Sequence, residues 1–505
     1  MVWSEQPCVR STRSQRCAQR QPGSARSSIC HSSPDVASSR ADTSMRDAQW
    51  PPSLWAESRR SFDSTRVDYA RRFDVAIVGA GYTGLWTALY LKEFRPDLSV
   101  VLLDAVEPGF GASGRNGGWC SGLFPVEIDT LESLHGHHSA LAMQRAAIDA
   151  VDDVGRYVST HSIDCDWKKS GTLTVATNPV QESRLRQTIR REQQHGLNES
   201  DVRWLDATEL SRRVVVEHAR GALFSPHCAA LHPLKLVNGL VDRARALGVE
   251  IVGGFRATAI NDSGVVGLID GHSTDITAGW VVRATEGYTS ALRGEKRSVI
   301  PLYSYMVATE PLSDEVWSRI GWAGRETLAE GRLMVTYAQR TADGRIAFGG
   351  RGAGYRYASR VSPDFDTDAN VKHRIVATLH ELFPATRDAA ITHHWGGPLA
   401  VPRDWHPSVS IDHATRRIAA GGYVGDGVAL SHLTGRTVAA AICGHDSPDL
   451  SLPFVQHHNK RWELEPLRWL GVNAGLRLPV AADALEKRTN KPARRLTALM
   501  DKLLG

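Results

Sequence analysis

Three glycines after a short apolar run have the spacing that points most directly to chemistry. They form a GxGxxG motif within FDVAIVGAGYTGLWTALYLKEF, and Asp104 follows about 20 residues later. Such glycines allow a tight turn, close backbone approach to a diphosphate and close helix packing, and an acid at that distance binds the adenosine ribose. The pattern therefore favours a dinucleotide-binding site, and an ordinary glycine-rich turn is the alternative interpretation. The residues predicted to form the site are Gly79, Gly81, Tyr82, Thr83, Gly84 and Asp104.

A second glycine-rich segment, GFGASGRNGGWCSG at residues 109–122, follows directly. Its glycines let backbone amides face a ligand closely, and its polar side chains add hydrogen-bond donors. A plain loop is the alternative interpretation. The residues that we expect beside a flavin are Ser113, Gly114, Arg115, Asn116, Gly117 and Gly118.

A third segment lies far downstream, in AAGGYVGDGVALSHLTGRTVAAAI. Its glycines precede a helical run from Val428, so a second helix N-terminus is predicted, suited to stabilising negative charge on a reduced flavin. The residues assigned to this loop are Gly422, Gly425, Asp426, Gly427 and Val428. Two such elements at opposite ends of the chain fit one large cofactor, FAD, and require that they meet in space.

The elements that must position these residues can be read from the apolar pattern. Residues 75–78 form an expected buried strand, a helix follows the GxGxxG turn, and LSVVLLD at residues 98–104 forms the next strand. This βαβ unit indicates an α/β fold with a Rossmann-type FAD-binding domain.

Length and composition limit the alternatives. A chain of 505 residues predicts two or three domains, and 42% hydrophobic residues are normal for a globular protein. The net charge of +5 comes largely from the arginines before residue 45, so no nucleic-acid-binding face is indicated. The chain has no apolar run of membrane-spanning length and no cysteine or histidine cluster with metal-ligand spacing, so neither a membrane span nor a metal site is predicted.

Residues 1–44 are rich in Ser, Arg and Gln and poor in large aliphatic side chains. Such a stretch cannot bury enough apolar surface to fold, so it is expected to be a disordered extension. It superficially resembles an organellar transit peptide. Alternatively, Met45 is the true start and the upstream stretch is untranslated. The expected location of the protein is cytoplasmic.

Residues 54–444 resemble the D-amino-acid oxidase superfamily of flavoproteins, and within it the gamma-glutamylputrescine oxidases. Besides the glycine segments, the resemblance rests on IDCDWKKSGTLTVA, ALHPLKLVNGL, VVRATEGYTSAL, RTADGRIAFGGRG and HHWGGPLAVPRDWHP. It implies an FAD domain built from discontinuous segments and a substrate domain of mixed or antiparallel sheet that covers the flavin. The expected division gives the FAD domain residues 45–125, 226–298 and 401–450, the substrate domain residues 126–225 and 299–400, and a helical tail residues 451–505.

The resemblance also implies roles for single residues. Thr285 and Gly287, with Ala284, match an ATxG element that is expected beside the cofactor, and His232 with Pro233 matches an LHP element. A purely structural role is the alternative for both elements, and for His232 it is the favoured interpretation. Asp426 departs from relatives that carry His there. An acid at this position would repel an anionic reduced flavin, which puts oxygen reactivity in doubt.

Two absences narrow the expected chemistry. Residues 388–419 contain no cysteine, and some relatives attach FAD covalently through one in this stretch, so non-covalent FAD is expected. Amino-acid oxidases place a carboxylate-binding arginine where an ungapped comparison puts Leu399, which favours amines over simple α-amino acids. Arg351 is interpreted as a replacement cation or, equally, as a structural ion-pair partner.

Aromatic residues of the expected substrate strands are candidates for the pocket wall. Tyr305 and Tyr337, with Arg351, are the predicted catalytic residues, and Tyr303 is a further wall candidate; ordinary sheet packing is the alternative. The tail is expected to pack on the FAD domain rather than bind a membrane surface, and His457 and His458 are interpreted as a solvated turn.

The predicted function is FAD-dependent oxidation of an amine C–N bond, with hydride transfer to flavin N5 and with molecular oxygen as the electron acceptor. A dehydrogenase that passes electrons to another acceptor is the first alternative. A non-catalytic or NAD-binding Rossmann protein is the second, although it leaves the two downstream glycine segments without a use. The sequence indicates neither the substrate nor the oligomeric state.

Overall fold

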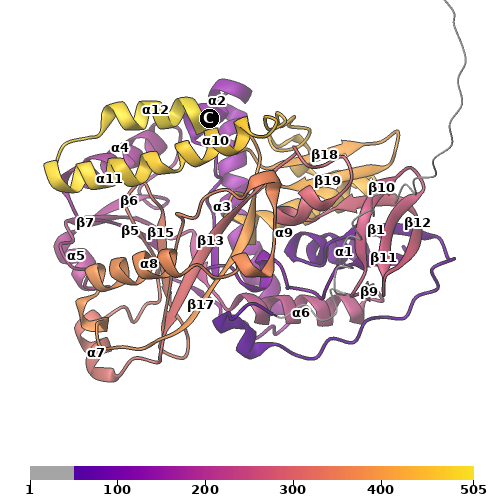
Figure 1. Ribbon diagram of the computed structural model, residues 1–505, viewed down its shortest axis with the longest axis horizontal. Helices are drawn as coiled ribbons and strands as arrows, with labels where there is room; N and C mark the ends of the chain where they lie inside the picture. The colour runs from indigo at the N-terminus through magenta and orange to yellow at the C-terminus, as the bar shows by residue number, and fades with distance from the viewer. Residues whose placement is uncertain (1–49, 505) are drawn as a thin grey trace, which may run out of the picture. The chain divides into compact units, whose positions relative to one another are not determined.

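The computed structural model describes residues 50–504, which belong to one compact unit. The expected extension, residues 1–44, lies outside the described residues. Two eight-stranded sheets and a three-stranded sheet form the β-structure of the described part (Figure 1). Among the helices of residues 50–504, none combines the length and apolar composition that a membrane crossing requires.

The first sheet contains the predicted βαβ unit. Strand β1 (Phe73–Val78) pairs in parallel with β2 (Val100–Leu103) and β12 (His272–Arg283), and the parallel set extends to β9 (Glu250–Val252) and β19 (Arg417–Gly421). Antiparallel strands β10 (Arg256–Asn261), β11 (Gly264–Ile269) and β18 (Ser408–Asp412) complete it. Segments far apart in sequence therefore build one Rossmann-type sheet.

Helices α1 (Tyr82–Phe94) and α9 (Gly427–Cys443) pack closely on each other beside this sheet (Figure 1). Gly435 makes the close approach possible, because a Cβ atom there would lie 2.5 Å from the Cβ of Trp86. Helix α6 (Pro233–Ala246) packs on α1, and α3 (His137–Thr160) packs on α9.

The second sheet has the strand order β17-β13-β16-β15-β14-β5-β7-β6 and is antiparallel except for the parallel pair β14–β5. Its strands are β17 (Ile391–Val401), β13 (Ile300–Thr309), β16 (Ile346–Gly350), β15 (Thr336–Arg340), β14 (Thr327–Glu330), β5 (Thr172–Ala176), β7 (Gly221–Ser225) and β6 (Arg203–Asp206). Helix α8 (Ala369–Leu382) packs on β13 and β16. The expected α/β class with a second, mixed sheet is confirmed.

The remaining elements connect these layers. The small sheet consists of β3 (Trp119–Ser121), β8 (Cys228–Ala230) and β4 (Lys168–Lys169), and the other α-helices before the tail are α2 (Ile128–His135), α4 (Pro179–Gln194), α5 (Ala207–Ser211) and α7 (Asp314–Ile320). Short 3-10 helices lie at Leu54–Ser58, Ala112–Gly114, Glu286–Ala291, Tyr357–Ser359, Pro363–Phe365, Pro384–Thr386 and Pro448–Ser451.

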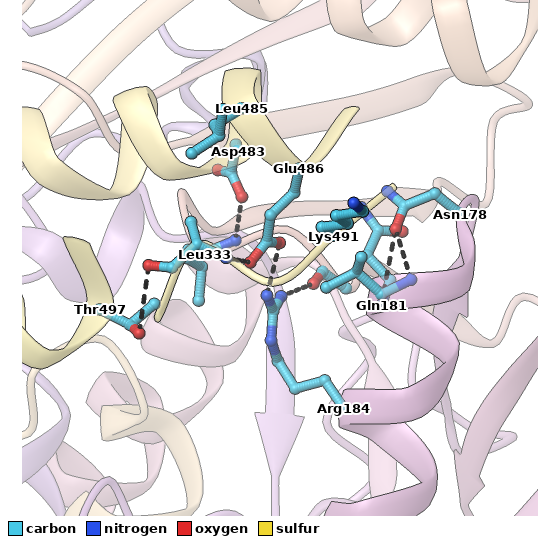
Figure 2. A network of polar contacts seen from close by, with 12 residues as sticks. Asn178, Gln181, Arg184, Leu333, Asp483, Leu485, Glu486, Lys491 and Thr497 are labelled. Carbon is cyan, nitrogen blue, oxygen red and sulfur yellow. Dashed lines mark hydrogen bonds and ion pairs between the residues drawn. The ribbon is translucent and has the colours of Figure 1, made fainter. Parts of the chain in front are cut away.

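The C-terminal helices α10 (Leu467–Gly475), α11 (Arg477–Thr489) and α12 (Arg494–Leu504) do not pack as expected. Asp483 of α11 accepts hydrogen bonds from the backbone amides of Leu333 and Met334, each 2.8 Å long. Glu486 pairs with Arg184 of α4 at 2.6 Å, as Figure 2 shows. The polar contacts of α11 thus lie on the second sheet and its helices rather than on the Rossmann-type sheet, and the expectation for the tail was wrong in this respect.

Candidate active site

The two downstream glycine segments both contact the first turn of α1, which follows the GxGxxG motif. The Ser113 Oγ atom accepts a hydrogen bond of 2.9 Å from the backbone amide of Tyr82. One residue further, the Thr83 hydroxyl is 2.9 Å from the hydroxyl of Tyr423, which belongs to the C-terminal glycine loop. Thus α1 joins residues 109–122 to residues 421–428, as a shared cofactor requires.

The GxGxxG glycines are needed for the close packing of this turn. Gly79 has φ of +107°, and a Cβ atom there would lie 2.3 Å from the carbonyl oxygen of Ala284. A Cβ atom on Gly84 would lie 2.0 Å from the carbonyl oxygen of Gly79. Gly81 is the N-cap of α1 and has no side chain to cap it, and the first amide of the helix, that of Tyr82, donates to Ser113, so the amides that follow it in the first turn are the ones suited to an anion.

Asp104 lies where β2 ends, next to the glycine turn. Its Oδ2 atom accepts a hydrogen bond of 2.9 Å from the backbone amide of Ala80, and its Oδ1 atom accepts one of 3.0 Å from Val106. Burial raises the pKa of the Asp104 carboxyl, although these two hydrogen bonds oppose the shift. The carboxylate is therefore fixed beside the turn, and its remaining lone pairs are the ones that could accept from a ribose.

The segment after Ser113 is shaped by its own side chains. The Asn116 amide donates to the carbonyl oxygens of Ala112 and Ser113 and accepts from the amide of Gly118. Gln339 of β15 donates to the carbonyl oxygen of Gly117 at 2.8 Å, which holds the segment against the second sheet. The Asn116 side chain thus stabilises the backbone of this loop, and both its carbonyl oxygen and its NH₂ group are hydrogen-bonded within the loop.

Arg115 is only 4% exposed, and its guanidinium is held by protein groups. It pairs with Asp366 at 2.9 Å, donates to the carbonyl oxygen of Gly396 at 3.1 Å, and donates to the hydroxyl of Tyr288 at 2.7 Å. The side chain therefore ties the glycine segment to the substrate sheet, which is a positioning role, whereas its backbone remains next to Ser113 and Gly114.

The C-terminal glycine loop ends at the N-terminus of α9. Asp426 is the N-cap residue of α9 without a side-chain capping bond, and Gly425 before it has φ of +121°. Gly422 packs on Pro402 so tightly that a Cβ atom would lie 2.6 Å from the ring. Burial raises the pKa of the Asp426 carboxyl to about 6, and the nearby Arg351 opposes the rise.

One face of the second sheet lies over the two downstream glycine segments. Tyr337 of β15 contacts Gly117, where a Cβ atom would lie 2.8 Å from the ring, and its hydroxyl is 2.8 Å from the hydroxyl of Ser304. Arg351 donates to the carbonyl oxygen of Val424. Leu399 lies 3.7 Å from the position of a Cβ atom on Gly425. The structure thus brings Tyr337, Arg351 and Leu399 together with the glycine segments.

Tyr305 lies on the other face of the same sheet. Strand residues alternate between faces, and Tyr303, Tyr305 and Val307 belong to the hydrophobic core that includes α8, whereas Met306 belongs to the core of the FAD-binding part. The Tyr305 hydroxyl donates to the carbonyl oxygen of Phe365 at 2.7 Å. We therefore assign Tyr305 and Tyr303 to core packing and do not keep Tyr305 as a candidate catalytic residue.

The contacts of the ATxG and LHP elements are with other parts of the protein. Gly287 lies against Pro398, with a Cβ position 2.7 Å from the proline carbonyl oxygen, and the Thr285 hydroxyl is 2.8 Å from that of Thr289. The Thr285 hydroxyl is thus engaged by Thr289, and Gly287 provides room for the close approach of Pro398. His232 is the N-cap of α6 and its Nδ1 atom accepts from the amide of Lys235, in line with its structural interpretation.

The arrangement fits a dinucleotide cofactor with an anion at each of two helix N-termini. Helices α1 and α9 begin without side-chain caps, whereas α4 and α8 are capped by Asn178 and Asp368. Apart from the Tyr82 amide, which donates to Ser113, the first-turn amides at these two starts are suited to a diphosphate at α1 and to a flavin ring at α9. The site is thus that of a dinucleotide-binding flavoprotein fold.

Comparison with known proteins identifies the family. The family model DAO, described as "FAD dependent oxidoreductase", matches residues 74–441. "Probable oxidoreductase OrdL" of Haemophilus influenzae is 30% identical over 80% of this chain and 88% of its own length, and "Gamma-glutamylputrescine oxidoreductase" of Escherichia coli is 30% identical over 74% and 84%. The chain belongs to the DAO family of FAD-dependent oxidoreductases, and its cofactor is FAD.

A solved structure supports the fold independently. The glycine oxidase of Geobacillus kaustophilus superposes with a TM-score of 0.63 over 77% of this chain and 99% of its own, at 20% sequence identity. At that identity the similarity defines the fold, while the resemblance predicted from the glycine segments is confirmed by the family match and the two relatives.

Sequence reasoning missed several residues of the site. Ser304 could have been found from strand alternation, since it lies between two tyrosines that face the other way. Gln339 and Glu286 gave no such signal, because a lone glutamine in a strand and an acid in a turn are ordinary. Glu286 accepts from the amide of Tyr423 in the C-terminal glycine loop, and burial raises its pKa to about 7.

Proposed function

We propose that this enzyme oxidises the C–N bond of an amine. When bound, FAD would supply the hydride acceptor at flavin N5, and molecular oxygen would take up the electron pair and two protons to become hydrogen peroxide. The substrate loses a hydride from the carbon next to nitrogen and a proton from nitrogen, and leaves as an imine. The chain's own contribution is to orient that carbon, keep the nitrogen neutral and exclude water.

One observation carries this proposal: neither Leu399 nor Arg351 is available to bind a substrate carboxylate. Leu399 is uncharged, and the guanidinium of Arg351 is already bonded within the protein. Leu399 packs toward Gly425, where it offers no charge to a substrate carboxylate. Arg351 donates to the carbonyl oxygen of Val424 and interacts with Asp426. A simple α-amino acid thus lacks the bidentate partner that its carboxylate needs, which favours an amine. A relative named gamma-glutamylputrescine oxidoreductase supports the same substrate class.

The polar groups on this face suit an amine nitrogen. The hydroxyls of Tyr337 and Ser304 form a pair at 2.8 Å, and either can accept from or donate to a nitrogen. Asp426, with its pKa at about 6, is mostly ionised at neutral pH and can draw in an ammonium group or take its proton. Burial of these groups lowers the cost of keeping the substrate nitrogen neutral.

Asp426 also favours a second candidate function, a dehydrogenase that uses another electron acceptor. Its carboxylate stands at the N-terminus of α9, where its negative charge opposes the stabilisation of negative charge that this helix start supplies. A peroxidase-coupled assay separates the two. Hydrogen peroxide in proportion to substrate indicates an oxidase, and turnover only with an artificial acceptor indicates a dehydrogenase.

Anaerobic reduction of the purified, FAD-loaded enzyme tests the proposed substrate class. We expect gamma-glutamylputrescine or another amine of the panel to bleach the flavin absorbance. Sarcosine serves as the secondary-amine member of that panel. Glycine and D-alanine should leave the flavin oxidised, and rapid bleaching by either would contradict the argument from Leu399.

A further inference from the structure

Three histidines from separate segments meet at one place outside the flavin site. His135 ends α2, His406 lies between β17 and β18, and His457 follows the 3-10 helix Pro448–Ser451. Each offers one ring nitrogen, and these three nitrogens lie within 4.8 Å of one another. The rings of His406 and His457 stack with centroids 3.7 Å apart, and the ring of His135 is 6.1 Å from that of His406.

The hydrogen bonds of His406 fix which of its nitrogens is free. Its Nδ1 atom is 2.7 Å from the carbonyl oxygen of Pro407, and because a carbonyl only accepts, Nδ1 carries the proton. The Nε2 atom therefore keeps its lone pair. His406 is 1% exposed, and Nε2 is buried with no hydrogen-bond partner among the described residues.

The other two histidines each also have a ring nitrogen that can bind a metal. His457 Nε2 lies 2.9 Å from Oδ2 of Asp404, so Nε2 donates to the carboxylate and Nδ1 keeps the lone pair. His135 Nε2 is also buried without a partner among residues 50–504. His457 therefore differs from the solvated turn expected from sequence, because its side chain is 15% exposed and has an ionic partner.

Such a set has the features of a metal site. Divalent zinc, nickel and copper bind neutral imidazole nitrogens, and a metal-bound histidine commonly donates its other ring nitrogen to a carboxylate or a backbone carbonyl. Both kinds of outer partner are present here, in Asp404 and Pro407.

We propose that His135, His406 and His457 bind one divalent transition-metal ion, with Zn²⁺ as the ion that fits this ligand set best. Zn–N bonds of about 2.0–2.1 Å lie in the plane of each imidazole ring, so binding requires one ring to turn out of the parallel His406–His457 stack. The site is distinct from the flavin site and does not depend on the proposed reaction.

The ion would cross-link three segments next to the C-terminal glycine loop. Pro402, four residues before His406, packs on Gly422 of that loop. Asn459, two residues after His457, donates to the carbonyl oxygen of His406 at 2.7 Å and to Asp404 at 2.8 Å. A bound ion therefore adds a link between α2 and a hydrogen-bonded pair of loops, and a thermal stabilisation is expected.

Calorimetric titration of the full-length, FAD-loaded enzyme after chelator treatment tests the proposal. We expect saturable binding of one Zn²⁺ per chain, a rise in Tm with Zn²⁺, and no comparable binding of Mg²⁺, which prefers oxygen ligands. His135→Gln and His457→Gln should each weaken Zn²⁺ binding at least about 10-fold, and Asp404→Asn by about 10–100-fold. His458→Gln is the matched control, because His458 is exposed and adjacent, and should bind normally.

Several results would overturn this site. They are the absence of saturable Zn²⁺ binding by the wild-type chain, full affinity in a His135→Gln/His457→Gln double variant, or an equal loss in His458→Gln. The wild-type titration needs no variant to fold, and retained flavin absorbance shows that a variant is folded. Because Zn²⁺ binding is measured without an amine, its failure leaves the proposed function standing, and the reverse also holds.

Discussion

The two sides of the flavin site use different parts of the chain. On one side, which we call the frame, the N-terminal turns of α1 and α9 present backbone, and glycines such as Gly79 and Gly84 leave no room for a Cβ atom. On the other side, which we call the wall, β13, β15, β16 and β17 present side chains such as Ser304, Tyr337 and Leu399. We propose from this difference that the frame binds the cofactor and the wall selects the substrate.

The largest effect is expected from filling the frame. Gly81→Val places a branched side chain where the diphosphate approaches the backbone, at a position 2.8 Å from the Ser113 Oγ atom. We expect FAD affinity to fall at least about 100-fold, on the order of 3 kcal/mol. The ratio of flavin to protein absorbance measures it. Gly471→Ala, at a position with open space around its Cβ, is the control and should keep its flavin.

A change on the wall should alter substrate choice instead. Leu399→Arg places a cation next to Gly425, where a substrate carboxylate could pair with it. We expect anaerobic flavin reduction by glycine or D-alanine to rise about 10-fold or more, while FAD stays bound. Leu399→Met, which conserves volume and adds no charge, is the control. No gain with any amino acid would show that Leu399 does not face the substrate.

The two faces of the substrate sheet offer a matched pair of tyrosines. Tyr337→Phe removes the hydroxyl that pairs with Ser304 on the flavin side, so we expect kcat/KM to fall about 10-fold with little loss of stability. Tyr305→Phe removes a hydrogen bond to Phe365 on the α8 side and should cost about 1 kcal/mol in unfolding free energy. Activity and denaturant unfolding of both variants check this, and the reverse pattern would reverse our assignment of the faces.

The smallest predicted effect concerns the charge at the start of α9. Asp426→Asn removes a negative charge beside the flavin position, so the two-electron midpoint potential should rise by about 30 mV at pH 8. Because the pKa of Asp426 is about 6, the wild-type carboxyl is protonated below that pH, and the difference between variant and wild type should shrink there. Spectroelectrochemical titration at pH 8 and pH 5 measures both values.

The Asp426 carboxyl should also make the free energy of unfolding depend on pH. Its pKa in the folded chain is raised above the ordinary value of 3.8, so the folded state holds the proton more tightly than the unfolded state. Its contribution to stability is therefore lost as pH rises from about 4 to about 6. Asp426→Asn should remove this loss, and chemical unfolding of apoprotein across that range would detect it. An unchanged pH dependence in the variant would contradict the buried position of Asp426.

The frame could be predicted from sequence because its chemistry is in the backbone. Gly79, Gly81, Gly84 and the loop before Val428 occur at fixed spacing next to strands and helices, which a linear pattern records. The wall could not be predicted as well. Tyr305 and Tyr337 look alike in sequence, and only the pairing of their strands decides which face each one takes.

Residues that depend on long-range contacts were harder still. Arg115 was predicted beside the flavin, and its partner Asp366 lies 251 positions away, so no local pattern could reveal that its guanidinium is engaged. The position of α11 could not be predicted for the same reason, because this helix is held on the second sheet by single polar contacts such as Asp483 with the amide of Leu333. The first part of the tail does lie against the Rossmann-type sheet, where Val455 pairs with Val409 of β18.

Side-by-side FAD titration of Gly81→Val and Leu399→Arg apoproteins tests the division between frame and wall most directly. We predict that Leu399→Arg binds FAD within about 3-fold of wild type, whereas Gly81→Val shows at least about 100-fold weaker binding. Equal FAD affinity in the two variants, or a larger loss in Leu399→Arg, would contradict it.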